Sequence, residues 1–529
     1  MQKFCLIILF LITFFSCYSV EKHNAQLEKK IAVDELKSDI DYVYKKLINN
    51  QPDLDWFITE VNLKKKFDSV KASIHQPLKP IEFYYKLDPL LGEIKQGHNG
   101  FFAPQKKYTK KETKALSKTK GTFSQFTFQF TPNELYISKN NSDDKTIPIG
   151  QKIYKINDNS IDGLYKKYRK LEYSDGFNTT FIDQMMARKF ANYYSLDHGL
   201  QDSITLEFLI NDSIIKKTVY RKNIDDKPKE KIEKKDSATQ PKLTKQELKI
   251  NKLKNKNYGF DRESKKYAIE LSYPTQDSTI AQLKVRNFTK GFPKKAYQEI
   301  FQNIEDHQVK DLILDLRNNG GGYLKDAQEL YTYLQDSTMA FTQKTKVTSK
   351  TSLAKNYPRN LPFLAKIVGF PAWSSLSVSS IFNTKKAEDG NYYYKIFSSK
   401  PKAAKDNNFK GNIYVLMNGG SFSATSILIS MLDQYTNAIF IGEESGGNYN
   451  GTVAGQLPVF TLPNSKLKFQ LGLMSVKPNT LYNEINGHGK IPEYEVKPTK
   501  ADILKDRDPI LKKALNLIEN NSKTSIEIN

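Results

Sequence analysis

Two segments of the chain combine an apolar run, a turn of small residues and a helical pattern, and the second turn holds serines. Residues 311–322 read Asp-Leu-Ile-Leu-Asp-Leu-Arg-Asn-Asn-Gly-Gly-Gly, and residues 415–426 read Val-Leu-Met-Asn-Gly-Gly-Ser-Phe-Ser-Ala-Thr-Ser. The first amides of a helix stabilise an anion, and a serine becomes a nucleophile when a neighbouring base takes its proton. Together the two turns can supply an oxyanion site and an attacking hydroxyl.

The strongest candidate nucleophile is Ser423, at the junction between the strand that ends near Met417 and the apolar helix expected over residues 424–432. The structural alternative is an N-cap serine, because serine is favoured at that position for its own hydrogen bonding. The three glycines at 320–322 favour the functional interpretation, since glycines after a buried strand permit close backbone approach and unusual dihedral angles.

Taken together, these segments resemble the S41 peptidase family, which includes the C-terminal processing proteases and the tricorn-like proteases. The family pattern Leu-Asp-Leu-Arg-x-Asn-x-Gly-Gly is matched by Leu314-Asp-Leu-Arg-Asn-Asn-Gly-Gly-Gly322, and its nucleophile segment by residues 415–426. Two later motifs are similar as well, in Ala438-Ile-Phe-Ile-Gly-Glu443 and Gly487-His-Gly-Lys-Ile-Pro-Glu-Tyr-Glu-Val496. The resemblance covers nearly all of residues 258–500.

The resemblance implies a serine endopeptidase that hydrolyses peptide or protein substrates through an acyl-enzyme on Ser423, with no metal or cofactor. The backbone amides of Gly321 and Ala424 are then the expected oxyanion donors. Ser421 and Ser426 flank the nucleophile.

Members of the family pair the serine with either a lysine or a histidine. The lysine position is occupied here by Asn448, within Ser445-Gly-Gly-Asn-Tyr449, and an amide cannot accept the serine proton. The resemblance therefore points to the histidine type, in which His98 is the general base and Glu484 orients it.

Three questions about the base remain open at this point. Tricorn-like members carry a serine beside the histidine, whereas Gly97 stands here, so that either the role is dispensable or another hydroxyl supplies it, with Asn99 as a possible helper. His488 is a rival base, and His98 could also be an ordinary surface residue of its turn.

Composition and periodicity divide the chain into five parts of an α/β protein. The third part is expected to be PDZ-like because residues 147–161 partly resemble a PDZ-domain sequence. Family resemblance adds a ClpP or crotonase-like ββα spiral for the catalytic domain. Residues 340–408 are irregular and aromatic, and we expect a flap or substrate wall there. The expected parts are a signal peptide at 1–17, a helical N-terminal domain carrying His98 at 27–118, a PDZ-like, mainly β domain at 121–222, a lysine-rich linker at 226–257 and the catalytic domain at 258–515.

The first residues have a basic start, an apolar run from Phe4 to Phe15 and a small residue before Cys17, which is typical of a bacterial secretory signal. Cys17 fits lipoprotein processing, in which it is acylated, with ordinary cleavage as the alternative. We expect an exported protein, periplasmic or lipid-anchored at the outer membrane. The two cysteines, Cys5 and Cys17, both lie in or beside the signal, so the mature fold has no disulfide.

The formal net charge of +23 could indicate a nucleic-acid or membrane adaptor. The lysines are scattered, however, and no aromatic-interleaved basic platform accompanies them, so we expect no nucleic-acid partner. The rival to a peptidase is a catalytically inactive protein on the same fold that binds a peptide or an apolar ligand.

Overall fold

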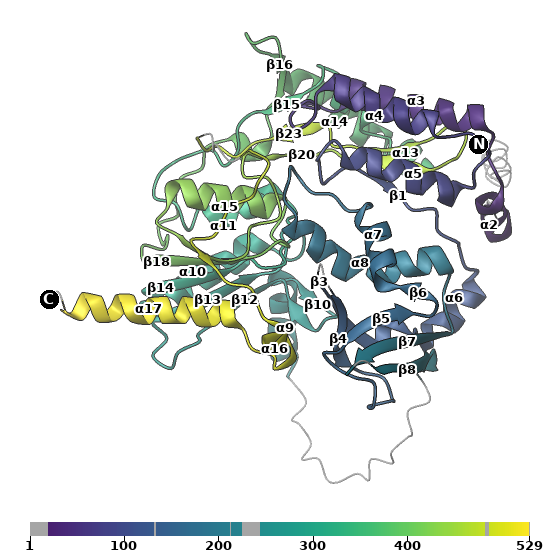
Figure 1. Ribbon diagram of the computed structural model, residues 1–529. Coiled ribbons are helices and arrows are strands. Elements are labelled where there is room, and N and C mark those ends of the chain that lie inside the picture. Colours follow the sequence, from purple (N-terminus) through teal and green to yellow (C-terminus); the bar gives the residue numbers. More distant parts are fainter. Residues whose placement is uncertain (1–18, 132–133, 212, 225–243, 482–485, 528–529) are drawn as a thin grey trace.

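The computed structural model describes residues 19–131, 134–211, 213–224, 244–481 and 486–527 (Figure 1). It is a mixed α/β structure in which a helical region, a mainly β region and a strand and helix region follow one another in the chain. No helix among the described residues is both long and apolar enough to cross a membrane.

The N-terminal region owes its helices to apolar residues spaced three or four apart, as Leu36, Ile40, Val43 and Leu47 are all buried. A short strand follows the last helix and pairs antiparallel with a strand from far along the chain. A hairpin within the range expected for the catalytic domain therefore packs into the N-terminal core. These elements are α2 (Val20–Glu28), α3 (Val33–Asn50), α4 (Glu60–Ala72), α5 (Pro80–Gly92), β1 (Gly100–Phe102), β21 (Val459–Thr461) and β22 (Lys468–Gln470).

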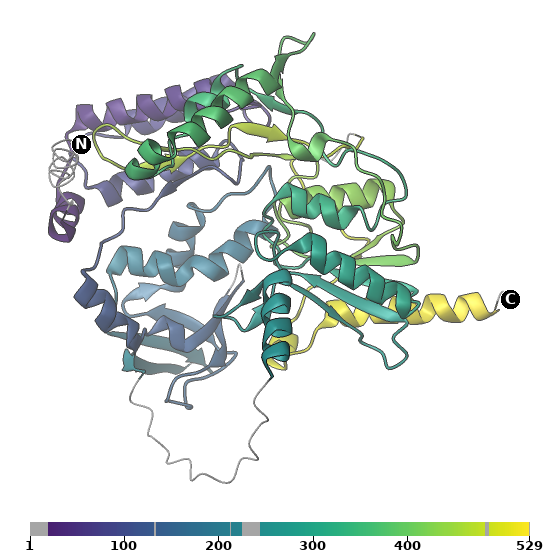
Figure 2. The same ribbon diagram turned by 180° about the vertical axis from the view of Figure 1, so that it is seen from behind.

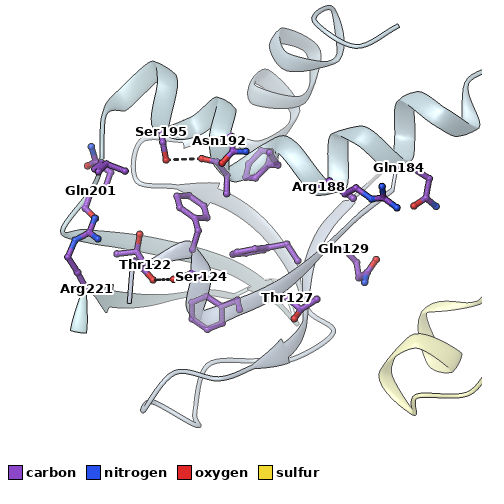
Figure 3. A pocket seen from close by; sticks show the side chains of 18 residues that line it. Thr122, Ser124, Thr127, Gln129, Gln184, Arg188, Asn192, Ser195, Gln201 and Arg221 are labelled. Atoms are coloured by element: carbon purple, nitrogen blue, oxygen red, sulfur yellow. Dashed lines mark hydrogen bonds between the residues drawn. The ribbon is translucent and has the colours of Figure 1, made fainter. Parts of the chain in front are cut away.

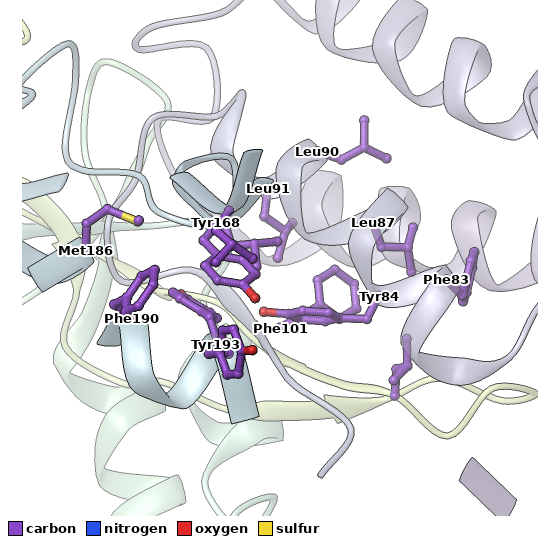
Figure 4. Packing of buried hydrophobic residues seen from close by; sticks show 14 of the residues in the cluster. Phe83, Tyr84, Leu87, Leu90, Leu91, Phe101, Tyr168, Met186, Phe190 and Tyr193 are labelled. Atoms are coloured by element: carbon purple, nitrogen blue, oxygen red, sulfur yellow. The ribbon is translucent and has the colours of Figure 1, made fainter. Parts of the chain in front are cut away.

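The middle region is an antiparallel sheet of order β3-β4-β5-β7-β8, with β6 paired to β5, so that β3 is an edge strand. Helices α7 and α8 lie against it and share one apolar core with α5 (Figure 4). The elements are α6 (Lys110–Ser117), β2 (Thr119–Lys120), β3 (Phe126–Thr131), β4 (Glu134–Asn140), β5 (Lys152–Ile156), β6 (Asn159–Ser160), α7 (Ile161–Arg169), α8 (Thr180–His198), β7 (Ser203–Ile210), β8 (Ser213–Tyr220) and β9 (Lys222–Asn223).

The third region is built on a six-stranded sheet of order β12-β13-β14-β18-β19-β24, parallel except for β12. Helices α10, α11 and α15 cover one face and α17 covers the other. The elements are β12 (Ile269–Ser272), β13 (Ile280–Val285), α10 (Pro293–Asp306), β14 (Asp311–Asp315), α11 (Leu324–Tyr331), β18 (Asn412–Met417), α15 (Ala424–Tyr435), β19 (Ile439–Gly442), β24 (Tyr494–Glu495), α16 (Lys500–Leu504) and α17 (Pro509–Glu527).

Strands β14 and β18 are neighbours in this sheet, with Asp315 opposite Leu416. Because parallel strands end at the same edge, the turns that follow them are brought together there. The two segments that suggested an oxyanion site and a nucleophile are therefore adjacent in space.

A second, antiparallel sheet of order β16-β17-β15-β23-β20 connects this edge with a group of three short helices. The helices lie within residues 340–408, which were expected to be irregular, so the expected lack of regular structure was wrong there, while the role as a flap or substrate wall stays a prediction. Their serine-rich apolar sequence has no clear amphipathic period, which hid them. The elements are β15 (Thr345–Val347), α12 (Ser352–Asn356), α13 (Phe363–Val368), α14 (Phe370–Asn383), β16 (Thr384–Lys386), β17 (Tyr392–Tyr394), β20 (Thr452–Ala454) and β23 (Met474–Val476).

Part of the expected linker at 226–257 is also helical. Helix α9 (Lys245–Asn257) begins with a capping box, in which Thr244 accepts a hydrogen bond from the Glu247 amide and the Glu247 carboxylate accepts one from the Thr244 amide. This cap satisfies two backbone amides at the start of the lysine-rich helix. A small ribbon of β10 (Phe260–Asp261) and β11 (Lys266–Tyr267) follows it.

Candidate active site

Ser423 lies at the N-terminus of α15 in a backbone conformation rare for a side-chain-bearing residue, with φ 61° and ψ −122°. Its hydroxyl does not cap the helix. Instead Oγ lies 3.0 Å from Nε2 of His98, a residue 325 positions earlier in the chain. The N-cap alternative therefore does not describe this serine, and a strained backbone of this kind is typical of functional sites.

The two flanking serines have structural partners. Ser421 is fully buried and donates a hydrogen bond from Oγ to the carbonyl of Leu316, which ties the two turns together. Ser426 is buried and donates to the carbonyl of Ser421. Of these three serines, Ser423 is the one in hydrogen-bond contact with a histidine.

His98 occupies the segment between α5 and β1, and this segment is braced from several sides. Gln470 Nε2 donates to the His98 carbonyl at 2.9 Å, and the Gln96 side chain accepts from the Val453 amide of β20. The imidazole stacks on Phe422, with ring centroids 5.0 Å apart. The ring is thus fixed in both position and tilt beside the serine.

Burial lowers the pKa of His98 to about 4, because the charged imidazolium loses solvation. The ring is therefore neutral near pH 7 and able to accept a proton. For Nε2 to accept from Ser423, the ring hydrogen must be on Nδ1. Nδ1 lies 3.0 Å from Oγ1 of Thr452 in β20, which can accept that hydrogen.

Behind Thr452 lies Asp175, a fully buried carboxyl. Burial raises the pKa of Asp175 to about 7, although a hydrogen bond from the Gly97 amide and the nearby Thr452 hydroxyl lower it. Oδ2 of Asp175 has no hydrogen-bond partner among the described residues. The Thr452 hydroxyl is therefore near this carboxyl but does not form a well-oriented hydrogen bond with it. The Thr452 hydroxyl thus contacts His98 and lies near the Asp175 carboxyl.

Thr452 and Asp175 are the functional residues that the sequence did not reveal. Thr452 lies on a three-residue strand, and Asp175 lies in a turn within the expected PDZ-like range. Neither position belongs to a motif that spacing could identify. One hint was available, because the absence of a serine beside His98 left open that a hydroxyl from elsewhere takes its role.

The reason that Gly97 cannot be the serine of the tricorn-like type is steric. A Cβ at this position would lie 2.8 Å from the ring of Phe422. Asn99 does not replace it, because its amide donates to Gln51 and its carbonyl accepts from the Gly472 amide. The stacking partner of His98 thus excludes a side chain at 97, and a hydroxyl reaches Nδ1 from Thr452 instead.

The two expected oxyanion donors differ in whether their amide already donates a hydrogen bond. The Ala424 amide, the first of α15, has no hydrogen-bond acceptor among the described residues. The Gly321 amide donates to Oδ1 of Asn319 at 3.0 Å. Gly321 has φ 95° and packs directly on Ser423, since a Cβ there would lie 2.7 Å from the serine Cβ. The backbone at Gly321 packs on Ser423 and the Ala424 amide follows that residue directly, but the Gly321 amide is engaged by a neighbouring side chain.

Residues 279–496 match the model of Peptidase family S41. The chain carries an S41 peptidase domain. Among solved structures, the chain is similar to mature CPAF, with TM-score 0.56, 14% identity and coverage of 89% of this chain and 94% of that one. It is also similar to mature CPAF complexed with lactacystin, with TM-score 0.58, 14% identity and coverage of 94% and 98%.

A further match is the photosystem II D1 C-terminal processing protease, with TM-score 0.38, 11% identity and coverage of 88% of this chain and 93% of that one. A search of curated proteins found no match. At these identities the CPAF structures establish a shared fold, and the roles of residues in the S41 domain rest on its own geometry.

His488, the rival base, and Asn448, at the position of the family's lysine, both have hydrogen-bond partners other than Ser423. His488 contacts Glu444, with Nδ1 3.1 Å from Oε1, and makes no hydrogen bond to Ser423 among the described residues. Asn448 is buried, and its Oδ1 accepts from the Gly487 amide at 3.2 Å, so it holds a turn. Neither residue is arranged as a base for Ser423.

Glu484, the expected partner of His98, and Cys17, the expected lipidation site, lie outside the described residues, and both stay predictions. Among the residues that are described, no group of three or more His, Cys, Asp or Glu side chains could hold a metal ion. The side chains at Ser423 are suited to acyl transfer and proton transfer.

Proposed function

We propose that the protein is a serine endopeptidase in which Ser423 attacks the peptide carbonyl and His98 is the general base. The observation that carries the proposal is the 3.0 Å approach of Ser423 Oγ to His98 Nε2. His98 takes the hydroxyl proton as the carbon to oxygen bond forms, and returns it to the leaving amine. A water molecule then hydrolyses the acyl-enzyme with the same base.

In this mechanism Thr452 and Asp175 act on His98 and not on the substrate. The Thr452 hydroxyl accepts the Nδ1 hydrogen, which keeps Nε2 free to receive the serine proton. An ionised Asp175 behind Thr452 stabilises the imidazolium that forms in the transition state. Glu484, a predicted partner for the same nitrogen, remains a candidate alongside them.

The oxyanion of the tetrahedral intermediate would be stabilised first by the Ala424 amide. The Gly321 amide joins it once it is released from, or shared with, Asn319 Oδ1. Loss of one such donor typically costs about 3 to 4 kcal/mol of transition-state stabilisation. The occupied Gly321 amide is also the one observation that favours the alternative function, a non-catalytic peptide-binding protein.

Substrate binding would involve the middle region, which we propose is PDZ-like, joined to a ClpP or crotonase-like catalytic domain. Edge strand β3 and helix α8 border a groove of about 580 Å³ (Figure 3). A peptide can add to such an edge by main-chain hydrogen bonds. Arg188 lines the groove and donates to Asn318 at 2.7 Å, so the groove adjoins the glycine turn beside Ser423.

We further propose export and lipid attachment at Cys17, and a peptide or protein as the substrate. Reaction of the protein with a fluorophosphonate probe separates the two functions. We expect labelling of the wild type and of His488→Gln, none of Ser423→Ala, and strongly slowed labelling of His98→Gln, with circular dichroism confirming each fold. Correctly folded wild-type protein that does not label would establish the binding alternative.

A further inference from the structure

The helices α13 and α14, here called the apolar hairpin, expose large apolar side chains to solvent on their outer side. Leu364 is 64% exposed, Val368 81% and Phe382 75%. Ile367, Phe370, Leu376 and Val378 are exposed as well. Contiguous exposed apolar surface of this kind marks an interaction site, in contrast to single apolar residues on a surface.

Both sides of helix α14 mix serines with apolar residues, since Ser375 and Ser379 are exposed and Trp373 and Ile381 are half-buried. Ser380 is buried, with its hydroxyl donating to the carbonyl of Ser377, while Leu376, Val378 and Phe382 point outward. A helix folded against water places its apolar stripe on the protein and its serines outside. On α14 three large apolar side chains are exposed while a serine is buried, which is the arrangement expected where the outer side of the helix meets an apolar medium.

Positive charge adjoins this surface. Residues 341–402 contain eleven Lys and Arg residues against two acidic ones. Four of these lysines line a cavity of about 840 Å³ at the end of α14 together with Glu388 and Asp389, and none of the four makes an ion pair among the described residues. These four, the lysine rim, are Lys344, Lys385, Lys386 and Lys395.

The hairpin lies at the end of the molecule where the described chain begins (Figure 2). Its supporting segment is joined to the N-terminal region, since Asn356 donates to Asn50 and Thr348 to the carbonyl of Asn49. Ser19, which caps α2, is only two residues after Cys17. At about 3.6 Å per residue, a lipid on Cys17 would hold this start of the fold within roughly 7 Å of a bilayer surface.

We propose that the apolar hairpin and the lysine rim form a docking surface for an anionic lipid bilayer. The apolar side chains enter the boundary between headgroups and acyl chains, and the lysines contact phosphate groups. A second copy of the chain is the competing occupant. It is disfavoured because a two-fold contact through this surface places two lysine rims near one another. The proposal does not depend on peptidase activity.

The test uses the chain from Tyr18 onward, which contains every described residue and no lipid. Sedimentation with vesicles of phosphatidylethanolamine and phosphatidylglycerol should capture it at least tenfold better than vesicles of phosphatidylcholine. Capture should fall more than tenfold in a triple variant with Leu364→Ser, Val368→Ser and Phe382→Ser. A double variant with Lys385→Gln and Lys386→Gln should bind the anionic vesicles more weakly, and its binding should depend less on salt concentration. Ile214→Ser with Tyr220→Ser, exposed on β8, is the matched control and should change nothing.

Trp373 provides an independent readout, because it lies in α14 and the chain has two tryptophans. In a Trp56→Phe background, anionic vesicles should shift its emission to shorter wavelength. The proposal is overturned if anionic vesicles fail to bind the protein, or if the triple hairpin variant binds them like the wild type. It is also overturned if that variant turns a dimer into a monomer by light scattering while vesicle binding is unchanged.

Discussion

His98 and His488 are the two histidines that the family motifs made candidates for the general base, and their hydrogen-bond partners differ. His488 has a carboxylate partner in Glu444 and a side chain 39% exposed, yet it makes no contact with the nucleophile. Among the described residues no carboxylate is hydrogen-bonded to the His98 ring, which lies between Ser423 and Thr452. A carboxylate beside a histidine is thus a weaker sign of a general base than a hydroxyl within reach of each nitrogen.

The largest effect that separates the two histidines is expected from replacing the proposed base. His98→Gln keeps a hydrogen-bonding side chain but cannot take up a proton, so kcat/KM should fall about 10²- to 10⁴-fold. Release of fluorescent fragments from labelled casein measures it, with circular dichroism to confirm folding. A loss of less than tenfold would remove His98 from the mechanism.

The next effect concerns the hydroxyl that holds the His98 tautomer. Thr452→Val preserves shape at a buried position and removes the acceptor for Nδ1, so we expect kcat/KM to fall about 10²-fold. Thr452→Ser restores the hydroxyl and should remain within threefold of the wild type. Equal activity of the Val and Ser variants would show that Thr452 only packs against the ring.

A smaller effect, dependent on pH, is expected from Asp175, whose pKa is raised to about 7 by burial. Its carboxyl is neutral below that pH and charged above it, so the help it gives to the His98 imidazolium should appear as pH rises from 6 to 8. Asp175→Asn should lower kcat/KM about tenfold at pH 8 and hardly at all at pH 5.5. The pH profile of the variant should lack the rise near 7.

Thermal unfolding separates this role from a structural one. Because the folded pKa of Asp175 lies above the unfolded value near 4, this carboxyl reduces stability as the pH rises from about 4 to 7. Asp175→Asn should therefore unfold at the same or a higher temperature at pH 8. A lower unfolding temperature together with a uniform loss of activity at all pH values would contradict the proposed role.

The smallest effect belongs to the other histidine. Glu444 Oε1 also accepts from the Gly489 amide, so the pair with His488 holds a turn. His488→Gln or Glu444→Gln should change kcat/KM less than threefold and cost about 0.5 to 1.5 kcal/mol of stability, the typical net value of one hydrogen bond. A loss of activity comparable to that of His98→Gln would reverse the comparison.

Local sequence patterns were enough to locate both turns beside Ser423, because each follows a buried strand and carries glycines or serines that few other structures require. His98 was found through its short turn. Thr452 and Asp175 were not, because each reaches the site through pairing and packing that no spacing encodes. The apolar α14 was missed for a related reason, since its serines and apolar residues are mixed on both sides of the helix and have no period that helix rules recognise.

The Ser423 and His98 pair has a consequence for the life of the chain. His98 directly precedes the segment that pairs as β1 with β22, and Ser423 lies at the start of α15 in the other region of the fold. An unfolded chain therefore carries both halves of the proposed catalytic pair without the ability to cut. Proteolytic activity would therefore require that the N-terminal region and the region around α15 have folded and docked. A measurement of that activity would report this docking.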